Sequence, residues 1–161
     1  MLEEYEKGAS MKSVLLIDIR SGDEGYHQLV QESIVILDKE GIHHSKVSVN
    51  HILEAPIALR FAVETFRSMN ESKVRNPNGY LVFGFIPKSE VFESVVYEEV
   101  LRSLQDMACY YGLALSHHTL FETKETEKEV GDLAQRMVFS CLNLIQMKKQ
   151  FGLQTNHIST P

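Results

Sequence analysis

Residues 13–19, with the sequence SVLLIDI, form a continuous apolar run that polar and turn-forming residues bound on both sides. A strand that is covered on both faces has this pattern, whereas a strand with one face in water alternates apolar and polar residues. A second run of this kind, YLVFGFI, occupies residues 80–86. These two runs predict buried strands of a sheet that has helices on both of its faces.

The segments around the two runs alternate between helical and extended patterns. Further strands are expected over residues 45–50 (SKVSVN) and 112–117 (GLALSH). Helical spacing of apolar residues predicts helices over residues 24–40, 54–69, about 94–111 and 125–150. The order βαβαβαβα predicts parallel strands joined by right-handed crossovers. The fold class is therefore α/β, a three-layer α/β/α sandwich around a flavodoxin-like, four-stranded parallel sheet.

Such sheets bind ligands beyond the carboxyl ends of their strands, where the strand order reverses. The loops predicted to form that edge are residues 20–25, 50–54, 86–93 and 117–123. His117 and His118 end the predicted fourth strand at this edge, which makes them candidates to contact a small molecule.

The composition narrows the classes of partner. The chain has 161 residues, of which 43% are hydrophobic and 24% charged, as in one globular domain with a substantial core. A net charge of -6 argues against a nucleic-acid partner. No apolar run reaches the roughly 20 residues of a membrane span, and the opening residues 1–12 lack the features of a signal peptide. We therefore expect a cytoplasmic protein with a loose arm at residues 1–12, one domain at 13–151 and a tail at 152–161.

Sequence motifs for common cofactors are missing. The chain has neither G-x-G-x-x-G after its first strand nor G-x-x-x-x-G-K-[ST]. In the loop RSGDEG (residues 20–25), Asp23 and Glu24 would repel a phosphate. The histidine pairs at 43–44 and 117–118 have no ligand partners at metal-binding spacing, and adjacent strand residues point to opposite faces. Cys109 and Cys141 lie in apolar helical patterns and are expected to be reduced core thiols. We expect no metal.

The stretch NHILEAP at residues 50–56, the glycine-containing strand YLVFGFI and the closing helix together resemble the lumazine synthase family, over residues 13–151. The resemblance implies 6,7-dimethyl-8-ribityllumazine synthase activity in riboflavin biosynthesis. This reaction condenses 5-amino-6-(D-ribitylamino)uracil with 3,4-dihydroxy-2-butanone 4-phosphate and needs no cofactor. The resemblance also implies a homo-oligomer, a pentamer or a multiple of pentamers, with active sites between neighbouring subunits.

The resemblance assigns substrate-binding roles to several residues. Ile52, Leu53 and Glu54 match the turn that holds the ribityl chain and the pyrimidine. The stretch 85–88 also matches: Phe85, Ile86 and Pro87 fall where the pyrimidine meets the backbone, and Lys88 falls near the phosphate site. Glu90 matches the acidic residue of that loop. Alternative interpretations are that Glu54 only stabilises a helix start, that Lys88 is a surface lysine and that Glu90 is a helix cap.

The chain departs from the family pattern at four positions. Ser21 stands where the family has an aromatic residue, and His117 stands at the aromatic position of the fourth strand. The position of the catalytic histidine is taken by Phe92 or Glu93, and Glu93 is the candidate general base if burial raises its pKa. The family's arginine near the start of the last helix falls near Gly131 or Asp132, and the nearest arginine is Arg136, about one turn further on. These departures leave open a non-catalytic homologue that serves as an oligomeric scaffold or a flavin-related binding protein.

Overall fold

The computed structural model describes residues 12–68, 76–122 and 127–152 of the chain. Strands and helices alternate along these residues. The elements are β1 (Ser13–Ile19), α2 (Glu24–Lys39), β2 (His43–Val49), α3 (Glu54–Ser68), β3 (Gly79–Ile86), α4 (Glu93–Tyr111), β4 (Leu115–Phe121) and α5 (Glu127–Gln150). The predicted arm and tail fall outside the described residues, except for Lys12 and Gly152.

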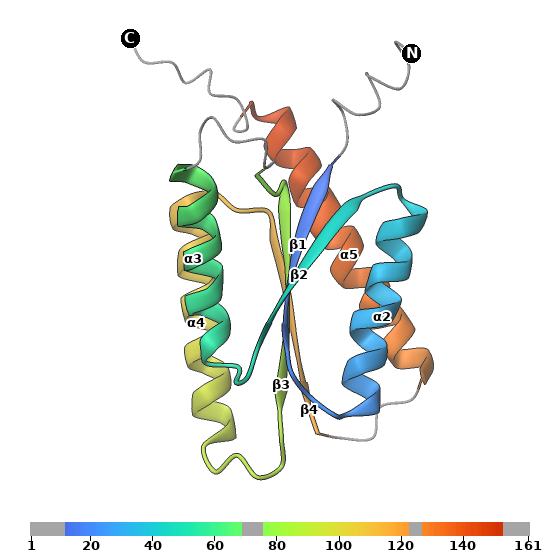
Figure 1. Cartoon of the computed structure of the whole chain (residues 1–161), viewed down its shortest axis with the longest axis vertical. Helices are drawn as coiled ribbons and strands as arrows, with labels where there is room; N and C mark the ends of the chain where they lie inside the picture. Colours follow the sequence, from blue (N-terminus) through green and yellow to red (C-terminus); the bar gives the residue numbers. More distant parts are fainter. Residues whose placement is uncertain (1–11, 69–75, 123–126, 153–161) are drawn as a thin grey trace.

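The strands form one parallel sheet in the order β2-β1-β3-β4. Helices α3 and α4 cover one face of the sheet and α2 and α5 cover the other (Figure 1). The predicted α/β/α sandwich with a four-stranded parallel sheet is confirmed. The strand order reverses between β1 and β3, so the carboxyl ends of these two strands mark the switch point of the fold.

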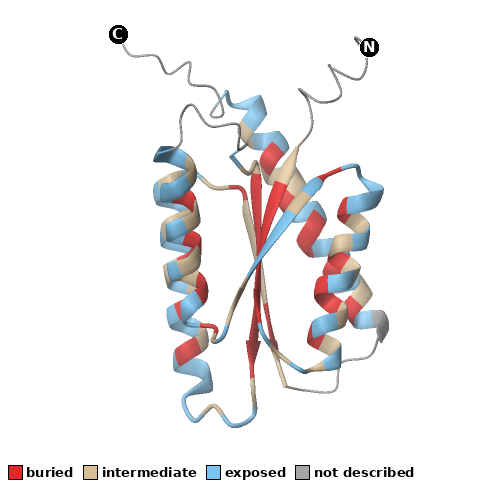
Figure 2. Cartoon of the chain, in the orientation of Figure 1, coloured by how far each residue is buried: buried red, intermediate tan, exposed pale blue. Residues whose placement is uncertain are grey.

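The core lies on both faces of the two central strands, as the apolar runs predict. Every residue of β3 is buried, and so is every residue of β1 after Ser13. Figure 2 shows this buried centre between helices whose outer faces are exposed. Strand β2 is mostly exposed because it forms an edge of the sheet.

The predicted boundaries of two strands, β4 and β2, are wrong for identifiable reasons. Helix α4 is capped by Gly112, which adopts the left-handed conformation at a φ of 64°. The backbone N–H of Leu113 then bonds back to the carbonyl of Ala108 at 2.9 Å, so β4 starts only at Leu115 and continues to Phe121. Strand β2 begins at His43, two residues earlier than predicted, because it pairs with β1 from Ser13 onwards.

The two cysteines differ in their surroundings. Cys141 is buried as predicted, and burial raises the pKa of its thiol to about 12. Cys109 is exposed, so its prediction as a core thiol is wrong. The apolar stripe of α4 is formed by Val96, Val100 and Leu104, which leaves Cys109 on the outer face.

None of the described helices is both long enough and apolar enough to cross a membrane.

Candidate functional site

Three loops at the carboxyl ends of the strands are joined by polar contacts. The imidazole Nε2 of His51, in the loop after β2, lies 3.3 Å from Oε2 of Glu90, in the loop after β3. The backbone N–H of Lys88 donates to the carboxylate of Glu122, just after β4, at 2.7 Å. The N–H of Glu122 donates in turn to the carbonyl of Ile86 at 3.0 Å. The loops therefore hold one another in place at the ligand edge of the fold.

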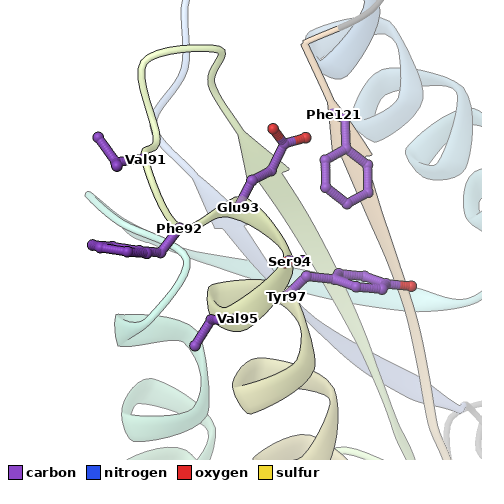
Figure 3. A pocket seen from close by; sticks show the side chains of 7 residues that line it. All are labelled: Val91, Phe92, Glu93, Ser94, Val95, Tyr97 and Phe121. Atoms are coloured by element: carbon purple, nitrogen blue, oxygen red, sulfur yellow. The ribbon is translucent and has the colours of Figure 1, made fainter.

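A hollow of about 400 Å³ opens beside these loops, at the start of α4. Its lining residues are Val91, Phe92, Glu93, Ser94, Val95, Tyr97 and Phe121. In Figure 3 the Glu93 carboxylate is directed toward the space beside the Phe121 ring, while Phe92 points away from it. Phe92 is 67% exposed and does not block the hollow.

The aromatic wall of the hollow comes from two residues that the sequence analysis did not identify. Tyr97 and Phe121 meet edge to face, with their ring centroids 5.3 Å apart. Phe121 ends β4, and it was missed because the predicted strand stopped four residues earlier. A signal was present, because Thr119 and Phe121 continue the period-two pattern of His117 on the same face. Because the two rings are inclined to each other, each offers its own flat apolar face, against which a planar ring can pack.

His117 does not lie at the ligand edge. It is the third residue of β4, where it pairs with Val82, and its ring lies on the face covered by α3 and α4. Its Nδ1 is 2.9 Å from the carbonyl of Val82 and its Nε2 is 2.7 Å from the hydroxyl of Thr119. Burial lowers the pKa of His117 to about 4, so the ring is neutral at pH 7. Both ring nitrogens of His117 therefore have a hydrogen-bond partner within the sheet.

The other predicted residues of the β1 and β2 loops lie at the ligand edge with different exposure. Glu54 is the exposed first residue of α3, and Leu53 beside it is 46% exposed. Ile52 is only 1% exposed and packs over Gly84, so it supports the turn from below. Ser21 is half-buried, and its hydroxyl accepts a hydrogen bond from the N–H of Asp23 at 3.1 Å.

The predicted residues after β3 divide into a buried and an exposed group. Phe85 and Ile86 are buried at the end of the strand, whereas Pro87 is half-buried and Lys88 is exposed. The Phe85 ring packs against Tyr26 at a centroid distance of 5.4 Å. The backbones of Phe85 and Ile86 pair with Leu120 and Phe121 of β4.

Arg136 lies outside the hollow. It is exposed on α5, and it is not among the residues that line the cavity. Within one chain, Arg136 belongs to a helix on the face of the sheet opposite to α4, the helix that begins at Glu93 (Figure 1).

The switch point between β1 and β3 is filled by the chain itself. The hydroxyl of Tyr26, from α2, accepts a hydrogen bond from the N–H of Ile19 at 2.6 Å and donates to the carbonyl of Phe83 at 3.3 Å. Tyr26 is 2% exposed, and burial raises the pKa of its phenol. The accessible part of the ligand edge therefore lies on the side of α3 and α4.

Metal chemistry finds no support in the described part of the chain, where no group of three or more His, Cys, Asp or Glu side chains is placed to hold an ion. The described residues of the four loops carry more acidic than basic groups. The acidic ones at the hollow and its neighbouring loops are Glu54, Glu90, Glu93 and Glu122.

Fold and site together define a class: a doubly wound α/β protein with an aromatic hollow beside the ends of its central strands and with carboxylates on the neighbouring loops. Comparison with known proteins identifies relatives of the chain. The chain is 26% identical to 6,7-dimethyl-8-ribityllumazine synthase of Bartonella bacilliformis, over 86% of this chain and 91% of that protein. It is 24% identical to the protein of the same name from Bartonella tribocorum, with the same coverage. No protein-family model matches the chain.

Proposed function

We propose that the chain is a divergent 6,7-dimethyl-8-ribityllumazine synthase, which condenses 5-amino-6-(D-ribitylamino)uracil with 3,4-dihydroxy-2-butanone 4-phosphate and releases phosphate and water. The observation that carries this proposal is the extent of the likeness to the two Bartonella proteins, which spans 86% of this chain rather than one motif. The parallel sheet and the joined loops at its ligand edge support it.

The uracil substrate has two parts, and the site offers a surface for each. The ribityl hydroxyls bind at the start of α3, where the Glu54 carboxylate is exposed beside Leu53. The flat ring binds along the backbone of residues 85–87 and packs against Phe121 and Tyr97. These two aromatic residues provide the apolar contact that Ser21 and the interior His117 do not.

The phosphate of the second substrate requires positive charge. Lys88 is exposed in the loop between β3 and α4. The N-terminus of α4 has no side-chain cap, because Phe92 occupies the N-cap position, so its N–H groups remain as donors for an anion. Since Arg136 lies on the outside of α5, it would complete the site only from a neighbouring copy. The proposal therefore includes a homo-oligomer, a pentamer or a multiple of pentamers, acting in the cytoplasm.

The reaction needs proton transfer but no metal or cofactor. The loop before α4 and the first residue of α4 carry the carboxylates that can accept a proton. The resemblance leaves the position of the acid–base residue to Phe92 or Glu93, and of these two only Glu93 can accept a proton. Positioning of the two substrates supplies most of the remaining rate enhancement, because a well-oriented pair avoids the entropy cost of a bimolecular step.

The deciding experiment is incubation of the purified chain with both substrates while the fluorescence of the lumazine product is followed. Formation of product above the uncatalysed rate is the expected result. Turnover equal to that of buffer alone would overturn the enzyme proposal. Light scattering tests the assembly, and a strict monomer in solution would contradict the shared site.

A second candidate function is a non-catalytic scaffold or flavin-related binding protein. It is favoured by one observation, the separation of Arg136 from the hollow, because loss of a cation would cost more in transition-state stabilisation than in binding. Binding of the uracil substrate or riboflavin by isothermal titration, together with absent turnover, would support this function instead.

A further inference from the structure

Two carboxylates lie close together in the chain, Glu90 in the loop before α4 and Glu93 at the first position of α4, and the structure holds them differently. Glu93 is exposed, and no hydrogen bond joins its carboxylate to another described residue. The side chain of Glu90 is 23% exposed and is joined to His51. Glu93 lines the hollow, whereas Glu90 is not among the lining residues but directly precedes one of them, Val91. A proton-transfer group must also be held in a fixed position, so the better-held carboxylate is the better candidate.

The ring of His51 is itself fixed by its own turn. Its Nδ1 lies 3.1 Å from the backbone N–H of Leu53, which donates to it. In the neutral ring, the proton must then be on Nε2, the nitrogen that faces Glu90 at 3.3 Å. The tautomer is thus set by the backbone, and the ring presents a donor to the Glu90 carboxylate.

The loop that carries Glu90 is also held by its backbone. The N–H of Glu90 donates to the carbonyl of Pro87 at 3.1 Å, which closes a turn, and the N–H of Lys88 is bound by Glu122. Hydrogen bonds therefore hold the main chain that carries the Glu90 carboxylate. The turn of His51 holds the ring nitrogen that donates to this carboxylate. Glu90 is 39 positions from His51 in sequence, so only the fold joins the two.

We propose that Glu90 is the catalytic proton-transfer residue of this site and that His51 is the residue that positions it. This inference rests on the proposed lumazine synthase function and names a different residue from Glu93 as the acid–base group. It also gives His51, to which the resemblance assigns no role, a defined task.

The proton in question follows from the chemistry of the ketone phosphate. Loss of phosphate from the terminal carbon requires removal of a proton from the neighbouring carbon, which lies next to the carbonyl carbon. The electron pair of that C–H bond forms the new double bond, and the electron pair of the C–O bond leaves with inorganic phosphate. Glu90 accepts the proton and returns it to the departing phosphate, so the carboxylate ends the step unchanged.

The test begins with turnover by the unaltered chain of residues 1–161, and then compares three carboxylate variants. Glu90→Gln is expected to lower kcat about 100-fold while the KM values change little, because general-base catalysis contributes about 100-fold or more. Glu93→Gln is expected to cause a clearly smaller loss. Glu98→Gln, at an exposed position further along α4, is the matched control that retains full turnover.

Two substitutions of His51 separate positioning from a structural role. The glutamine side chain of His51→Gln would keep a donor near the place of Nε2, whereas the asparagine side chain of His51→Asn would keep an acceptor near the place of Nδ1. If His51 positions Glu90, His51→Gln retains most of kcat and His51→Asn loses about 10-fold or more, in line with loss of a positioned catalytic group. If the ring only supports the turn through Leu53, the order is reversed.

The outcomes are distinguishable. An unaltered chain without turnover overturns the proposed function together with this inference. An active chain in which Glu90→Gln keeps kcat within about threefold, or in which Glu93→Gln is the more damaging change, overturns this inference alone. Thermal unfolding of every variant identifies any loss of kcat that comes from a damaged fold.

Discussion

The hydroxyl oxygen of Tyr26 lies 2.6 Å from the backbone nitrogen of Ile19 and accepts its hydrogen bond, although Tyr26 belongs to α2 and Ile19 ends β1. The same hydroxyl donates to the carbonyl of Phe83 in β3. The paired residues of β1 and β3 end at Ile17 and Val82, so the phenol bridges the two strands just beyond their ladder. A side chain from the helical layer thus closes the switch point of the sheet.

Removal of this bridge is expected to destabilise the fold. Tyr26→Phe keeps the ring and its contact with Phe85 but leaves the N–H of Ile19 and the carbonyl of Phe83 without the hydroxyl in a buried place. The expected loss in the free energy of unfolding is about 1–3 kcal/mol, the cost of leaving a buried polar group unsatisfied. Urea denaturation measures it. Tyr110→Phe is the control, because Tyr110 is 82% exposed, and an equal loss in both variants would contradict the bridging role.

Gly84 of β3 provides the space into which Ile52, from the turn after β2, packs. A Cβ at this position would meet the hydroxyl of Thr119 and would lie 2.8 Å from Cδ1 of Ile52. Gly84→Ala is therefore expected to cost about 1–3 kcal/mol of unfolding free energy, as overpacking of a core does. Calorimetric unfolding checks this value, and a variant as stable as the original chain would show that the turn relaxes.

Gly131 provides the opposite case within α5. A Cβ there meets nothing within 4 Å, and Gly131 is absent from the described glycines of positive φ. Gly131→Ala is expected to raise the unfolding free energy by about 0.5–1 kcal/mol, because alanine is the better helix former. Measured beside Gly84→Ala, it separates the effect of crowding from the general effect of adding a methyl group.

Phe121 is expected to contribute to ligand binding more than to the fold. Phe121→Leu keeps an apolar side chain at the end of β4 but removes the flat face of the aromatic ring beside Tyr97. Under the proposed function, the KM for the uracil substrate should rise by about 3–10-fold, since aromatic pairing is worth about 0.5–1.5 kcal/mol. Steady-state kinetics measure this change. Phe139→Leu, at a position that is 42% exposed on α5, should leave the KM unchanged.

The sequence was sufficient to predict the central strands of the sheet but insufficient to predict the bounds of its edge strands. Strands β1 and β3 are covered on both faces, so their apolar runs are unbroken and easy to recognise. Strand β4 contains His117 and Thr119, whose polar groups bond to each other and to Val82. In the sequence alone, polar residues such as these indicate the end of a strand, because their hydrogen bonds to a neighbouring strand are not visible there. The predicted strand therefore ends at His117.

The candidate site shows the same limit. Glu54 and Lys88 could be placed at the ligand edge because each follows a predicted strand. The pairing of His51 with Glu90 could not be predicted, because these residues belong to loops after strands that are not neighbours in the sheet. Contacts of this kind depend on where the first turns of α3 and α4 lie relative to each other on one face of the sheet. No local sequence pattern indicates that arrangement.

Lys148 is expected to stabilise the end of α4. Its Nζ donates to the carbonyl of Gly112 at 2.7 Å, and Arg67 donates to the neighbouring carbonyl of Tyr111 at the same distance. Burial, and next the charge of Arg67, lower the pKa of Lys148. Lys148→Met should cost about 1 kcal/mol, the worth of a cation at a helix C-terminus. Denaturation at low salt measures it, and Lys149→Met at the exposed next position should cost much less.

His117 is expected to make the fold sensitive to acid. Burial first, and the charge of His118 second, lower the pKa of His117 from 6.5 to about 4 in the folded chain, so between these values the unfolded chain binds the extra proton. Its contribution is therefore fully present above pH 6.5 and is lost as the pH falls toward 4, to a limit of about 3 kcal/mol. His117→Gln should flatten the dependence of unfolding free energy on pH in this window. His27→Gln, which alters an exposed histidine of α2, should leave the slope unchanged, and equal slopes for the original chain and His117→Gln would contradict the prediction.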